Sequence, residues 1–132
     1  MKKLQRVQAQ ADERWGFDFD AFDDLVGPQQ VLPAAGFARI EPELDKLHRQ
    51  MEYVVLALAG EVGELANLAK KARRDLLLKG NTTIAPAAMR DELADILAYA
   101  LKLANLMGWN LEEAYLEKMQ KNEARFGKLD NR

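Results

Sequence analysis

The sequence is most distinctive at residues 53–69, which read YVVLALAGEVGELANLA. This stretch has no lysine or arginine, and its only charged residues are Glu61 and Glu64. Residues three apart share one face of an α-helix, so both glutamates can direct their oxygens to one point. The stretch therefore predicts a helix that carries two acidic side chains on an otherwise apolar surface.

Glycine and proline divide the rest of the chain into further helices. Pro42 can open the long helix, Thr82 or Thr83 can cap the next one, and Asn110 can cap the last. Gly108 is a helix-ending residue. The expected helices cover about residues 4–15, 42–78, 86–107 and 111–126.

Residues 16–38 differ from the helical segments because they are rich in glycine, proline and acidic residues, so we expect a loop there. Aromatic side chains within it pin the loop to the body or line a pocket, and pinning is the commoner role. These aromatic residues are Phe17, Phe19, Phe22 and Phe37. We expect one all-α domain over residues 1–132, a helical bundle with two long antiparallel helices, a core at 44–127 and this loop as an insertion.

The bulk composition narrows the class of protein. Hydrophobic residues make up 48% of the 132 residues, enough for a core, and the net charge of −2 argues against a nucleic-acid polymer as partner. There is no cysteine, which excludes thiolate chemistry. The first 14 residues lack the apolar core of a secretory signal, and no segment is typical of a membrane span. We therefore expect a cytoplasmic protein.

A second acidic pair, Glu92 and Asp95, has the same spacing as Glu61 and Glu64. None of the four acids has a lysine or arginine three or four residues away, as solvated helix acids commonly do. If a short turn sets the pairs opposite each other, two carboxylates about 4 Å apart repel by roughly 4 kcal/mol at an effective dielectric near 20. A bound divalent cation compensates that repulsion most completely.

The ligand type indicates which metal. Four carboxylates are hard donors that suit Mg²⁺ or Mn²⁺, and Mg²⁺ in such sites usually accompanies a phosphate substrate. The single histidine, His48, is not three residues after any of the four acids, which argues against a di-iron site and against zinc.

The long helix also predicts self-association. Apolar residues spread around most of its girth, so one chain offers too few partners to cover them. These residues include Leu56, Leu58, Val62 and Leu65. We expect a homodimer or a homotetramer.

Three motifs in order resemble the MazG-type nucleotide pyrophosphohydrolases. They are GEVGEL at 60–65, ELAD at 92–95, and Lys118-Met119 followed by Asn122, Arg125 and Phe126. Larger members often have a glutamate where this chain has Gly60, so the chain looks more like the small dCTP pyrophosphatase members.

The resemblance implies a Mg²⁺-dependent enzyme that converts a nucleoside triphosphate and water to the monophosphate and pyrophosphate, as in house-cleaning of non-canonical or surplus dNTPs. It implies that Glu61, Glu64, Glu92 and Asp95 bind the metal. The substrate-binding residues carried over from the family are Lys118, Asn122, Tyr99, Arg125 and Trp15.

Two residue roles, and the alternatives to an enzyme, remain hypotheses from the residues themselves. Glu61 or Glu64 can accept a proton from water as the catalytic base. Lys71 lies seven residues after Glu64 and can reach a phosphate, although a surface lysine is the commoner case. The alternatives to an enzyme are a non-catalytic helical dimer that binds nucleotide or metal, and a structural dimerisation domain.

Overall fold

A computed structural model describes residues 2–15 and 41–127 of the chain. In these ranges the fold is all-α, as the sequence predicts, and no strand is present. The helices are α1 (Lys2–Arg14), α3 (Pro42–Lys79), α4 (Pro86–Met107) and α5 (Leu111–Phe126). The predicted loop at 16–38, with its four phenylalanines, lies outside the described residues.

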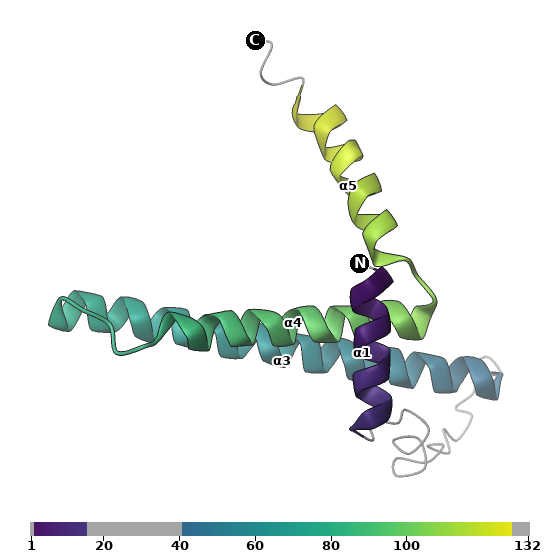
Figure 1. The fold of residues 1–132 in the computed structure, drawn as a ribbon, viewed down its shortest axis with the longest axis horizontal. Coiled ribbons are helices and arrows are strands. Elements are labelled where there is room, and N and C mark those ends of the chain that lie inside the picture. The colour runs from purple at the N-terminus through teal and green to yellow at the C-terminus, as the bar shows by residue number, and fades with distance from the viewer. Residues whose placement is uncertain (1, 16–40, 128–132) are drawn as a thin grey trace, which may run out of the picture.

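The two long helices α3 and α4 form an antiparallel hairpin that is the centre of the fold (Figure 1). Helix α1 crosses this hairpin and packs on α4. Helix α5 follows α4 after a short turn and extends away from the hairpin. The hairpin therefore holds both acidic pairs, while α5 stands apart from them.

The first half of α1 is fixed by an amide network around Gln5. Its side chain donates to Oδ1 of Asn105 at 3.1 Å and to the carbonyl of Trp109 at 2.8 Å. It also accepts from the backbone N–H of Leu111 at 3.2 Å, while the Asn105 amide donates to the carbonyl of Gln5 at 2.9 Å. One glutamine thus joins α1 to the end of α4 and the start of α5.

The helix ends follow the sequence signals in most cases. Pro42 is at the first turn of α3, and Glu41 before it accepts a backbone hydrogen bond from within that turn. Gly80 and Gly108 end α3 and α4 with φ of 74° and 69°, a left-handed conformation that glycine adopts without strain. Asn110 caps α5 as predicted.

The prediction that Thr82 or Thr83 caps α4 is wrong. The cap residue is Ala85, which makes no side-chain hydrogen bond to the helix. The hydroxyl of Thr83 donates instead to Asp75 at 2.8 Å, and that of Thr82 accepts from the backbone N–H of Ile84. Both hydroxyls are used within the turn, and Thr82 and Thr83 lie three and two residues before the cap position, which is Ala85.

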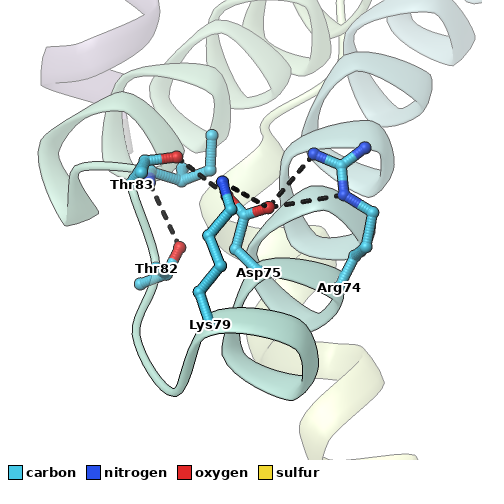
Figure 2. Close-up of polar contacts among 6 residues, drawn as sticks. Arg74, Asp75, Lys79, Thr82 and Thr83 are labelled. Carbon is cyan, nitrogen blue, oxygen red and sulfur yellow. Dashed lines mark hydrogen bonds and ion pairs between the residues drawn. The ribbon is translucent and has the colours of Figure 1, made fainter.

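Asp75 closes the tip of the hairpin (Figure 2). It is only 2% exposed, and besides Thr83 it accepts from Arg74 at 3.1 and 3.3 Å and lies 3.9 Å from Nζ of Lys79. The hydrogen bonds from Thr83 and then Arg74 hold the pKa of Asp75 below its ordinary value of 3.8, although burial opposes this. This acid is fully partnered and stabilises the turn.

The core within the described residues is small. Its fully buried apolar side chains are Val54, Leu101 and Ala104. Large apolar residues on α3 and α4 remain exposed, among them Val55, Leu56, Val62, Leu93 and Leu97. In residues 2–15 and 41–127, no helix is both long and apolar enough to cross a membrane.

Candidate active site

The hairpin brings three of the four predicted carboxylates together. Glu61 comes from α3, and Glu92 and Asp95 come from successive turns of α4. Each offers an oxygen, and these oxygens lie within 4.8 Å of one another. We call these three residues the acidic cluster. Its spacing is close enough for one ion to contact all three side chains.

Glu64, the fourth predicted carboxylate, is at the edge of the acidic cluster. It is exposed and is not one of the three residues whose oxygens converge. Glu64 is nevertheless close enough for its charge to contribute to the raised pKa of Glu92, so the two carboxyl groups are neighbours. Glu64 is therefore better placed to meet solvent or substrate than to complete the converging set.

Glu92 lies in surroundings that disfavour the charged form of its carboxyl group. Burial raises the pKa of Glu92 above its ordinary value of 4.5, and the nearby charges of Glu64, Glu61 and Asp95 raise it further. Its Oε2 atom is buried and has no hydrogen-bond partner. Within the described ranges, no lysine or arginine forms an ion pair with any of these acids. A buried oxygen without a donor is costly, and a hard cation is the ligand that fits this donor set.

Tyr99 lies next to the acidic cluster on α4. Burial, followed by the proximity of Tyr53 and then of the Glu61 and Asp95 charges, raises the pKa of the Tyr99 hydroxyl above 10.0. Tyr99 is half-buried. Tyr99, one of the predicted substrate-binding residues, is thus close to the acids, and its hydroxyl stays protonated.

Lys102 and Asp12 were not predicted from the sequence. Nζ of Lys102 lies 3.3 Å from Oδ1 of Asp12 and 4.7 Å from the centre of the Tyr99 ring. Lys102 follows Tyr99 by three residues, so its place on the same helix face was visible in the sequence. Asp12 was not visible as its partner, because the α1–α4 contact joins distant parts of the chain.

The other predicted substrate residues are not gathered at the acidic cluster. Lys118 and Arg125 are exposed on α5, which extends away from the hairpin, and Asn122 is half-exposed on the same helix. Lys71 is exposed on α3, and Trp15, just after α1, is 77% exposed. One chain by itself therefore joins the acids and Tyr99 but leaves the basic residues of α5 apart.

The structure thus belongs to the class of all-α proteins in which a helical hairpin brings carboxylates together, a donor set that suits a hard cation. Residues 49–128, more than half of the chain, match the family model described as the MazG nucleotide pyrophosphohydrolase domain. The chain therefore belongs to this family, which confirms the resemblance seen in its motifs.

Two mammalian proteins are similar in sequence to this chain. Mouse dCTP pyrophosphatase 1 is 34% identical over 94 residues, and human dCTP pyrophosphatase 1 is 37% identical over 87 residues. Each alignment covers 65% of this chain and 51% of the relative. The chain spans about half the length of the curated relatives it matches. No solved structure matches the chain.

Proposed function

We propose that the chain is a nucleoside triphosphate pyrophosphohydrolase that takes a nucleotide and Mg²⁺, or Mn²⁺ in its place, at the acidic cluster. The observation that carries the proposal is the buried, unpartnered Oε2 of Glu92 among converging carboxylates. Membership of the family supports the reaction class. Since the mouse and human relatives are named dCTP pyrophosphatase 1, dCTP is the first substrate to test, and removal of surplus or non-canonical dNTPs is the role that fits.

In the proposed reaction, different side chains bind the cation, accept a proton and contact the substrate. Glu61, Glu92 and Asp95 would hold the cation, which when bound would supply positive charge to the triphosphate and lower the pKa of a water. Glu64, exposed and beside Glu92, accepts the proton of the attacking water. The water oxygen joins the α-phosphorus, the bond from that phosphorus to the α–β bridging oxygen breaks, and pyrophosphate leaves with the electron pair. Tyr99 remains a donor to substrate, because its pKa is raised.

Pyrophosphate release from a panel of dNTPs and NTPs, with and without Mg²⁺, tests this function. We expect release that requires the cation and a Glu64→Gln variant that keeps the fold but loses at least about 100-fold in kcat. Glu52→Gln, an exposed change on the same helix, is the matched control and should keep full activity. Binding of nucleotide and Mg²⁺ without release from any nucleotide would favour a binding module instead.

We further propose that the working form is a homodimer or homotetramer. Exposed Val55, Leu56 and Val62 on α3, with Leu93 and Leu97 on α4, form an apolar surface that a second copy can cover. Self-association also offers a way for α5 of one subunit to reach the acids of another. Light scattering should show a mass above 14.9 kDa, and Leu56→Lys should reduce it.

Mixing two inactive variants tests whether α5 acts on another subunit. Lys118→Met removes the predicted phosphate contact, and Glu92→Gln removes a cation ligand. If the two residues serve one site from different chains, an equal mixture of the two variants recovers up to about a quarter of all sites, because random pairing makes about half of the dimers mixed and one of the two sites in each mixed dimer is intact. Absence of recovery after verified subunit exchange would mean that each site uses its own α5.

A further inference from the structure

Lys102 is a half-buried cation that the proposed reaction does not yet use. Its side chain is 11% exposed, and the side chain of its partner Asp12 is 13% exposed. Asp12 is itself held by the amide of Gln8, which donates to Oδ1 at 2.8 Å. An ion pair so shielded from water is more sensitive to geometry than a surface pair.

The same ammonium group also lies over an aromatic ring. Nζ of Lys102 is 4.7 Å from the centre of Tyr99, within the range of a cation–π interaction. Tyr99 follows Asp95 by four residues and precedes Lys102 by three on α4, so these side chains share one face of the helix and Tyr99 lies between Lys102 and the acidic cluster. Lys102 therefore contacts α1 on one side and the wall of the proposed site on the other.

The two halves of α1 are anchored by different contacts. Gln5 fixes the first half to the far end of α4, through Asn105 and Trp109. Asp12, which is three residues before the exposed Trp15, joins the second half to Lys102. The Lys102–Asp12 ion pair thus anchors α1 near the end that leads to Trp15.

We propose that Lys102 is a positioning residue for the nucleotide, because it holds Asp12 of α1 and the ring of Tyr99 in fixed relation to the acidic cluster. The inference rests on the proposed function, since it assumes that the cluster and Tyr99 face a nucleotide. Lys102 does not touch the reacting atoms. Its loss should therefore weaken nucleotide binding and leave cation binding and the chemical step largely unchanged.

The test is calorimetric binding of the α,β-imido analogue of dCTP with Mg²⁺ to the full chain, which needs no turnover. In Lys102→Met, which keeps the apolar stem, the analogue's Kd should rise about 5- to 30-fold. The Kd for Mg²⁺ alone should stay the same, and amide hydrogen exchange in the second half of α1 should increase. Lys102→Arg should restore most of the affinity, because arginine keeps the charge and stacks on aromatic rings.

Lys3→Met, an exposed lysine of α1, is the matched control and should bind like the wild type. Asp12→Asn should weaken binding as Lys102→Met does, and the double variant should be little worse than either one. An unchanged Kd in Lys102→Met, an equal loss of Mg²⁺ affinity, or no binding of the analogue by the wild type would each overturn the proposal. If the analogue binds but dCTP is not cleaved, the pyrophosphohydrolase function fails while the Lys102 experiment still decides its own question.

Discussion

Two acids on the same hairpin, Asp75 and Glu92, have opposite surroundings and opposite shifts in pKa. Asp75, at the tip, is 2% exposed and receives hydrogen bonds from Thr83 and Arg74, so its pKa is lowered. Glu92, in the middle, has a buried oxygen with no donor and lies among three other acids, so its pKa is raised. The tip acid is satisfied by the chain itself, whereas Oε2 of the middle acid has no hydrogen-bond partner among the described residues.

This difference distinguishes the structural acid Asp75 from Glu92, the acid of the proposed cation site, better than burial does. Asp75 and the Oε2 atom of Glu92 are both buried, but only Asp75 receives hydrogen bonds there. Glu92 costs stability in the cation-free protein, and such a cost is common where a site is prepared for a ligand. Replacing Glu92 by glutamine should therefore raise stability and lower activity, whereas replacing Asp75 by asparagine should lower stability and leave activity nearly unchanged.

The largest expected effect is on the middle acid. Glu92→Gln should lower pyrophosphate release by about 100-fold or more, because a cation ligand is lost. The same change should raise the melting temperature of the cation-free protein by on the order of 3 °C, because repulsion with Glu64 and Asp95 is removed. Differential scanning fluorimetry beside the release assay measures both.

Added Mg²⁺ sharpens the same contrast. Wild type should gain about 2.7 kcal/mol of stability at 100 times its Kd for the cation, and Glu92→Gln should gain much less. A variant that is both inactive and less stable than the wild type without cation would contradict the ligand role and make Glu92 a structural acid like Asp75.

Much of the hairpin follows from local signals in the sequence. Pro42, Gly80 and Gly108 fix helix ends through backbone restrictions that act within a few residues, so their effects were predictable. The spacing of Glu61 and Glu92 on helices of known limits also predicted that acids would face each other. These features need only the helical repeat and one short turn.

Other features depend on contacts between distant segments. Thr83 donates to Asp75 and lies two residues before the cap position of α4. Lys102 pairs with Asp12, which comes from α1. Helical periodicity carries no signal for which residue of α1 meets α4. The place of α5, which carries Lys118, is harder still to predict, because this helix leaves the hairpin (Figure 1) and no local signal in the sequence sets its direction.

A smaller effect is expected at the tip. Asp75→Asn should lower the melting temperature by on the order of 5 °C, because Arg74 and Lys79 lose the charge of their partner. It should leave kcat nearly unchanged, since Asp75 does not belong to the acidic cluster. Asp91→Asn is the matched control, because that acid is 71% exposed and its surface pair with Arg90 should matter little. A large fall in kcat at full folding would show that the tip also sets the geometry of the acids.

The smallest expected effect is the pH dependence of these two stability differences, and its sign is opposite at the two acids. The pKa of Asp75 is lower in the folded state than its ordinary 3.8, so its contribution is present above pH 3.8 and is lost as pH falls through the folded pKa. The pKa of Glu92 is higher in the folded state than its ordinary 4.5, so its relative stability is greatest below pH 4.5 and is lost as pH rises through the folded pKa. In cation-free unfolding titrations, the deficit of Asp75→Asn should therefore shrink below pH 3.8. The advantage of Glu92→Gln should vanish near pH 4.5 and grow above it. Parallel curves for the two variants would mean that both acids are held in the same way, and the contrast between tip and middle would fail.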